Sequence, residues 1–92
     1  MPFPNQNPVP FTLAGVMSLT PNQAGCYGIF SGNQWVYVGR GDIRTRLLDH
    51  LSNSTILAQN PTHFVTVLHA KPELLEKALI LECQPYCNQK VG

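Results

Sequence analysis

Charged residues are scarce in this chain of 92 residues: six are Lys or Arg and five are Asp or Glu, which gives a net charge of +1. So small a charge exerts no long-range attraction on a polyanion, and a nucleic-acid partner would have to be held by a local patch. The length leaves room for one small domain. The sequence has no apolar run of the about 18 residues that a membrane span needs and no signal-peptide pattern. We therefore expect a soluble, cytoplasmic protein without a membrane partner.

Cysteines are also few. The three present, Cys26, Cys83 and Cys87, are an odd number without a dense framework, which indicates reduced thiols in an intracellular setting. A structural zinc bound by Cys83, Cys87 and a histidine is the alternative, but this spacing matches no standard ligand pair. Buried or half-buried free thiols are the preferred interpretation.

Prolines are concentrated at the N-terminus, where they occupy four of the first ten positions. Proline blocks both helices and central strands, so residues 1–10 are predicted to be extended. Residues 1–18 are assigned to a proline-rich N-terminal arm, in which the apolar run after residue 10 is ambiguous, and residues 19–92 to the globular domain.

Apolar periodicity predicts the elements of that domain. Strands are expected over 26–30 and 35–38, joined by a turn at 31–33, and a third strand over 63–70. A helix should begin after Asp42, a suitable N-cap, because Ile43, Leu47 and Leu51 recur every four residues up to about position 52. A second helix is predicted over 71–83, where Pro72 lies near the start. The expected fold class is α/β (α+β), a three-stranded, largely antiparallel sheet packed by helices in the order β-β-α-β-α.

Polar side chains gather around the end of the second strand. Three of the six basic residues lie within seven positions there: Arg40, Arg44 and Arg46. Arg46 and His50 are four residues apart, on the shoulder of the face that buries Leu47. From that position they can reach the rim of the sheet.

Four segments together resemble the GIY-YIG nuclease family: "GCYGIF", "VYVGRG", "IRTRLLDH" and "LEKALILECQPYCN". The resemblance covers about residues 19–88. It assigns Tyr27 to the first signature, Tyr37 and Gly39 to the second, and Arg46 and His50 to the helix that follows.

The same resemblance decides between two candidate acidic residues on the last helix. Relatives often have Glu, then Asn twelve positions later, with a proline just before the Asn, and Glu76, Asn88 and Pro85 fit this pattern. Glu82 does not fit, and six residues of helix place it about 120° from Glu76 around the axis.

The family implies hydrolysis of DNA phosphodiester bonds with a single Mg²⁺ (or Mn²⁺) held by Glu76. A permanently charged guanidinium suits Arg46 to the transition state. Contacts to the DNA backbone are expected from Arg40, Arg44, Gly39 and Gly41. The resemblance implies Tyr27 as general base and Asn88 as a hydrogen-bonding group of the site. The residues alone do not rank Tyr27, Tyr37 and His50 for that role, because a tyrosine of pKa about 10 is a poor base at neutral pH.

The sequence thus predicts a metal-dependent endonuclease. Two alternatives share the fold: a catalytically silent nucleic-acid-binding module and a protein-interaction module. A protein partner that supplies targeting is compatible with the low charge. The oligomeric state and the biological pathway stay open.

Overall fold

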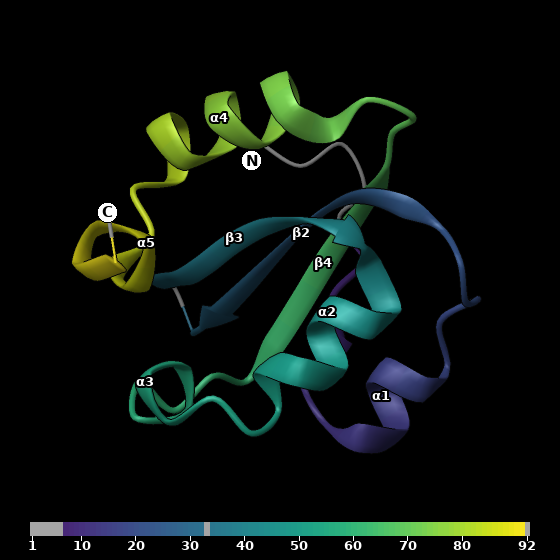
Figure 1. The fold of residues 1–92 in the computed structure, drawn as a ribbon. Coiled ribbons are helices and arrows are strands. Elements are labelled where there is room, and N and C mark those ends of the chain that lie inside the picture. The colour runs from purple at the N-terminus through teal and green to yellow at the C-terminus, as the bar shows by residue number, and fades with distance from the viewer. Residues whose placement is uncertain (1–6, 33, 92) are drawn as a thin grey trace.

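The computed structural model describes residues 7–32 and 34–91, so residues 1–6 of the predicted arm and Asn33 of the predicted turn lie outside the description (Figure 1). The strands are β1 (Val9–Pro10), β2 (Ala24–Ser31), β3 (Gln34–Asp42) and β4 (His63–Leu68). The helices are α1 (Leu13–Met17), α2 (Ile43–His50), α3 (Ser54–Leu57), α4 (Pro72–Cys83) and α5 (Tyr86–Val91). In the described part of the chain, no helix is long and apolar enough to cross a membrane.

The four strands form one antiparallel sheet in the order β1-β4-β2-β3. The predicted fold class, an antiparallel sheet packed by helices, is confirmed, but the predicted strand count is one too low. The additional strand is β1, in which Val9 pairs with Phe64 of β4. Pro10 has no backbone N–H, and a strand of two residues at the sheet edge accommodates it because the outer side of an edge strand needs no donor.

Residues 11–17 follow β1 directly and pack on the body of the domain. The Thr12 hydroxyl accepts a hydrogen bond from the Gly15 N–H and caps α1. Phe11 and Val16 are 7% and 0% exposed and belong to the core. This part of the predicted arm is helical over 13–17 and contributes apolar burial to the domain.

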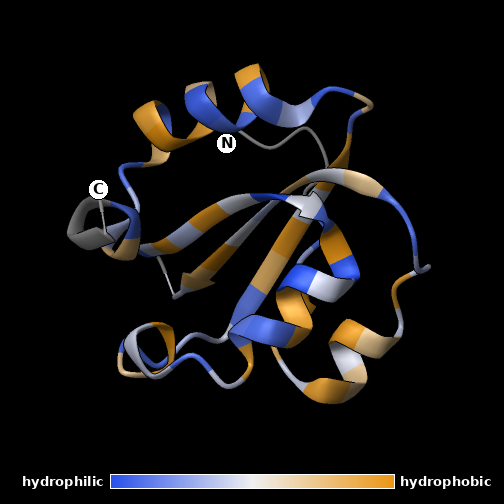
Figure 2. Ribbon diagram, in the orientation of Figure 1, coloured by the Kyte–Doolittle hydropathy of each residue, from blue (hydrophilic) through white to orange (hydrophobic). Residues whose placement is uncertain are grey.

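Each face of the sheet has its own apolar cluster. On one face, Tyr27 and Ile29 of β2 pack with Ile43 and Leu47 of α2. On the other face, a second cluster is formed by Cys26, Val38, Val65 and Leu79 of α4. Figure 1 shows α1, α2 and α3 on one side of the sheet and α4 on the other, and Figure 2 shows apolar residues along the strands between them. Alternate residues of β2 therefore point to the α2 face or to the α4 face. In β3 a bulge interrupts this alternation, so Val36 and Tyr37 both belong to the cluster on the α2 face.

The end of β3 leads directly into α2. Asp42 occupies the N-cap position as predicted, but its side chain makes no capping hydrogen bond. The helix ends at His50, two residues earlier than expected, and its buried residues are Ile43, Leu47 and His50. Burial of the first two side chains fixes the helix against the sheet and places its last turn over β2.

Candidate active site

A buried tyrosine and a buried histidine are joined by a hydrogen bond at the centre of the α2 face. The hydroxyl oxygen of Tyr27 lies 2.7 Å from Nε2 of His50. The two residues are 0% and 7% exposed. Burial lowers the pKa of His50, and the positive charge of Arg46 lowers it further, so the imidazole is neutral at neutral pH.

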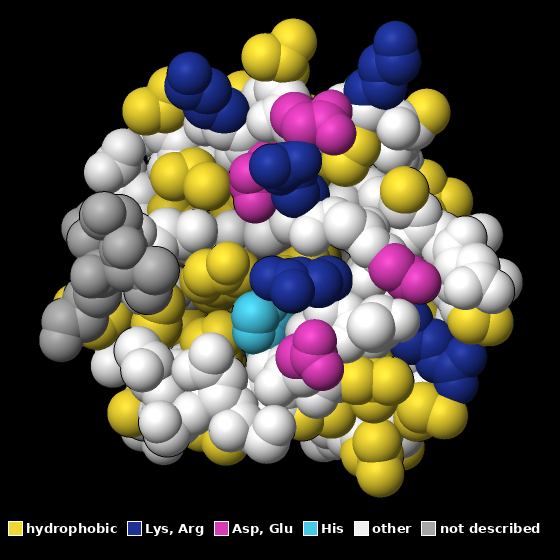
Figure 3. All heavy atoms as spheres, in the orientation of Figure 1, with side chains coloured by type: hydrophobic (Ala, Val, Ile, Leu, Met, Phe, Trp, Pro, Cys, Tyr) yellow, Lys and Arg dark blue, Asp and Glu magenta, His cyan; other side chains and the backbone are white. Residues whose placement is uncertain are grey.

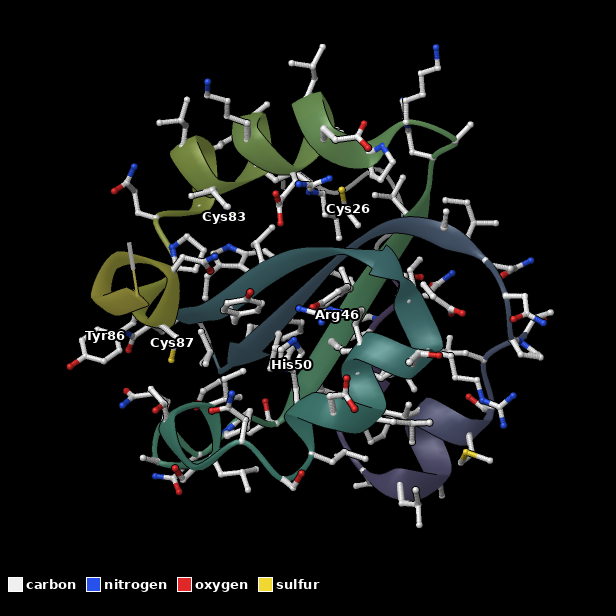
Figure 4. The ribbon with its side chains drawn as sticks, viewed as in Figure 1. Cys26, Arg46, His50, Cys83, Tyr86 and Cys87 are labelled. Carbon is white, nitrogen blue, oxygen red and sulfur yellow. The ribbon has the colours of Figure 1, made fainter. Side chains whose placement is uncertain are left out.

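Arg46 lies one helical turn before His50 and is exposed. Its guanidinium lies close enough to the Tyr27 hydroxyl to interact with it, and this interaction is the largest cause of a raised Arg46 pKa. Arginine can only donate, so Arg46 presents N–H groups to the Tyr27 oxygen; in the His50 tautomer whose Nε2 carries no proton, the Tyr27 O–H donates to that nitrogen. Figure 4 shows Arg46 and His50 side by side on α2 where it crosses the sheet.

The pKa of Tyr27 is raised well above that of a free tyrosine. Burial is the main cause, and the neighbouring Tyr37 adds to it, while Arg46 acts in the opposite direction. A free phenolate at neutral pH is therefore disfavoured.

Tyr37 of β3 completes the aromatic part of the site. Its ring centroid lies 4.9 Å from that of His50 and 6.3 Å from that of Tyr27. Tyr37 is half-buried, whereas Tyr27 is fully covered. Of the two tyrosines, Tyr37 is the one whose side chain solvent already reaches.

Two glycines of β3 leave space beside these side chains. Gly39 pairs with Tyr27 across the sheet, and a Cβ atom at position 39 would overlap the hydroxyl oxygen and Cζ of Tyr27. Gly41 has φ +125°, in the region that favours glycine, and a Cβ atom there would lie 3.3 Å from Cγ of Arg46. Absence of side chains at both positions allows the tyrosine and the arginine to meet.

Arg40 and two glutamates form a second group on the α4 face. Nε of Arg40 lies 3.1 Å from Oε1 of Glu76, and Nη1 lies 3.4 Å from Oε1 of Glu73. Arg40 pairs with Cys26 in the sheet and so points toward α4. The side chain of Glu76 is 22% exposed, and that of Glu73 is 60% exposed. The Glu76 carboxylate is thus held at the rim of the sheet.

The two groups lie on opposite sides of the edge strand β3. Tyr27, Arg46 and His50 belong to the α2 face, and Arg40 and Glu76 to the α4 face. They remain electrostatically connected, because the negative charge of Glu76 contributes to the raised pKa of Tyr27. In Figure 3, basic, acidic and histidine side chains follow one another down a single side of the molecule.

Two predicted residues lie elsewhere or are used differently. Nη2 of Arg44 lies 3.2 Å from Sδ of Met17 in α1, so this side chain points away from Arg46. Two residues of helix turn a side chain by about 200°, which separates neighbours in the sequence. The Asn88 amide pairs with the backbone of Val38: its Oδ1 accepts the Val38 N–H at 2.7 Å and its Nδ2 donates to the Val38 carbonyl at 2.9 Å.

We expect an Asn88→Asp variant to lose about 1–3 kcal/mol of unfolding free energy, because a carboxylate would face the Val38 carbonyl without a proton to donate. Urea unfolding measures this loss, and Thr45→Ala, an exposed change on α2, is the control. An Asn88→Asp variant as stable as the parent chain would contradict the structural role of this amide.

Glu73 is the residue of this surface that the sequence analysis did not select. It lies three residues before Glu76, a spacing that places both side chains on neighbouring positions of one helix face. The signal was therefore present in the sequence, but no pattern of the family resemblance pointed to it.

A metal ion would be held by few protein atoms. Among the described residues, no group of three or more His, Cys, Asp and Glu side chains lies close enough to hold an ion, which leaves the alternative zinc site without a ligand set there. Burial raises the pKa of Cys26 and of Cys83 to about 11, so both are unreactive thiols. Glu76 fits a different ion: Mg²⁺ is typically held by one or two carboxylates, with water and phosphate oxygens as the remaining ligands.

The buried imidazole predicts a pH dependence of stability. The pKa of His50 is lower in the folded chain than the 6.5 of a free histidine. At a pH between these two pKa values the unfolded chain binds more protons than the folded chain. The contribution of His50 to the free energy of unfolding is therefore complete above pH 6.5 and is lost as the pH falls through the pKa of His50 in the folded chain. Urea unfolding across this range should give lower stability at lower pH, and His50→Gln should flatten the profile. An unchanged profile in His50→Gln would contradict the assignment.

Comparisons of this chain with protein-family models, with curated proteins and with solved structures found no match.

Proposed function

We propose that this chain is a metal-dependent endonuclease that hydrolyses DNA phosphodiester bonds. The observation that carries the proposal is the Tyr27–His50 hydrogen bond of 2.7 Å, with the charge of Arg46 beside the same hydroxyl. Phosphodiester hydrolysis needs a group that takes a proton from water and a cation that stabilises the phosphoryl oxygens. This arrangement supplies both within one helical turn of α2.

The proton path runs through two side chains. Water gives a proton to the Tyr27 oxygen as the Tyr27 proton moves to Nε2 of His50, so the hydroxyl stays protonated overall and no free phenolate is required. The lowered pKa of His50 keeps the imidazole ready to accept at neutral pH. Tyr37, whose ring contacts His50, orients the imidazole from the exposed side.

Arg46 has to leave Tyr27 before this transfer. A phosphate oxygen competes for the guanidinium, and a charge-assisted bidentate contact is stronger than one to a neutral hydroxyl. Movement of Arg46 onto the phosphate then exposes the Tyr27 oxygen to water. The same residue would protect the site in the free protein and stabilise charge in the transition state.

Glu76 would hold the ion, Mg²⁺ or Mn²⁺, which neutralises charge on the phosphoryl and leaving oxygens when it is bound. Arg40 competes for the carboxylate through its contact of 3.1 Å. This guanidinium is 46% exposed and can turn toward a DNA phosphate, as predicted for a backbone contact.

The test is nicking of supercoiled plasmid by the purified chain with Mg²⁺, with Mn²⁺ and with chelator. We expect nicking with either ion, loss with chelator, and a loss of at least about 100-fold in Glu76→Gln, because charge stabilisation of this kind contributes several kcal/mol. Glu82→Gln is the matched control, since Glu82 is an exposed carboxylate of the same helix. No nicking under any condition, or equal losses in both variants, would contradict the proposal.

The second candidate is a nucleic-acid-binding module without catalysis. The observation that favours it is the burial of Tyr27 and His50, which are 0% and 7% exposed. If Arg46 does not move, water does not reach the tyrosine. A DNA mobility shift without nicking would select this candidate over the enzyme. Binding to neither DNA nor RNA would favour the third alternative, a protein-interaction module.

A further inference from the structure

The outer face of α4 carries an apolar stripe. Leu74 and Leu81 are 81% and 67% exposed, and Ala78 between them is also exposed. Their spacing of four and three residues places them in one row along the helix. They lie opposite Leu79, which packs against the sheet. Figure 1 shows α4 at the outside of the molecule, and Figure 2 shows apolar bands on it.

Charged side chains border this stripe in a definite order. Around the helix axis, Glu73 and Lys77 lie on one flank, about 60–100° from Leu74, and Glu82 lies on the other, about 80° away. Lys71 is the N-cap residue immediately before α4, and its position at the start of the helix is on the same flank as Glu82. All four residues are exposed. Each flank thus carries one charge of each sign at different heights along the helix.

We propose that this stripe is a dimerisation surface on which α4 of a second copy of this chain packs antiparallel. In a two-fold antiparallel pair, each flank meets the same flank of the other copy in the reverse direction. Lys71 then lies opposite Glu82 of the second copy, and Lys77 lies about 4.5 Å along the helix from its Glu73. Antiparallel packing also brings opposite ends of the two helix dipoles together.

The apolar side chains fit the same arrangement. With Lys71 level with Glu82 of the second copy, the two-fold axis passes between the levels of residues 76 and 77, about 2 Å along the helix from Ala78, whose small side chain lets the helices approach. Leu74 of one copy then packs beside Leu81 of the other, so the most exposed leucines of both helices cover each other.

Dimerisation through this stripe is independent of the proposed nuclease activity. Glu76 lies about 160° from Leu74 around the helix, on the side of the sheet, so both copies keep their candidate sites open. Plasmid nicking tests the nuclease and the oligomeric state tests the dimer, so a failure of one proposal does not decide the other.

The first measurement is sedimentation equilibrium over micromolar to submillimolar protein concentration. The parent chain is expected to approach twice its monomer mass, and Leu81→Glu to remain monomeric. Leu13→Glu is the matched control, because Leu13 on α1 is 63% exposed and should leave the dimer intact. A parent chain that is monomeric throughout, or a Leu81→Glu variant that still dimerises, would overturn the proposal.

The second measurement tests the antiparallel direction by charge reversal. Glu73 also pairs with Arg40 of its own chain, which makes Lys71–Glu82 the pair to test. Lys71→Glu and Glu82→Lys each place like charges opposite each other and should dimerise more weakly than the parent chain. An equimolar mixture of the two variants restores opposite-charge pairing and should recover dimer. A mixture as monomeric as its components would overturn the antiparallel pairing.

Discussion

A Tyr27→Phe variant is expected to cleave DNA about 10²–10⁴-fold more slowly than the parent chain, the usual contribution of a positioned proton-transfer group. The phenyl ring keeps the packing on the α2 face, but no oxygen remains between water and Nε2 of His50. Nicking rates at saturating Mg²⁺ measure the loss.

The stability of this variant should change much less than its activity. Removing the hydroxyl leaves the buried Nε2 of His50 without its hydrogen-bond partner, which costs about 1–3 kcal/mol. Circular dichroism must show folded protein at the assay temperature. Tyr86→Phe, a change of the same kind on α5, is the control and should cleave like the parent chain. Undiminished cleavage by folded Tyr27→Phe would refute the relay through Tyr27.

Gly39→Ala should also have a large effect, on both stability and activity. The added Cβ would overlap the hydroxyl oxygen and Cζ of Tyr27 and lie 2.9 Å from Cε2 of Tyr37. Overpacking of this kind costs about 1–3 kcal/mol. Displacement of the tyrosine by about 1 Å can cost about 100-fold in rate. Urea unfolding and plasmid nicking measure the two effects.

The control for this substitution is Gly32→Ala. A Cβ atom at position 32 meets nothing within 4 Å, so the variant reports only the backbone cost of replacing a glycine at φ +59°. Cleavage by Gly39→Ala at the rate of the parent chain would show that activity does not depend on the close approach of Tyr27 to Gly39 of β3.

The elements that the sequence predicted are those with a strong period. The strands at 26–30 and 35–38 lie within β2 and β3, and the helix over 71–83 matches α4 within one residue. The weak elements were missed. β1 has two residues and contains Pro10, and α5 begins immediately after Pro85, so neither presents a pattern long enough to be recognised. The extra strand forms because one edge of β4 is not covered by β2, and there Val9 pairs with Phe64.

The candidate site was predictable in part, for a geometric reason. Arg46 and His50 are one helical turn apart, so the sequence alone places them together, and the structure brings both to Tyr27. Glu76 lies on the other side of β3 from Tyr27, Arg46 and His50. The sequence alone does not predict this separation, because the face to which each strand residue points depends on the register of the whole sheet. The contact of Asn88 with Val38 joins residues 50 positions apart and leaves no local pattern.

The Asn88 amide has a consequence for how the chain behaves at high concentration. An edge strand with free N–H and C=O groups is a template onto which a strand of another molecule can add. At Val38, in the middle of the outer strand β3, the amide of Asn88 already satisfies both backbone groups. One side chain thus takes the place that a neighbouring strand would occupy, and growth of the sheet from molecule to molecule is blocked at this point.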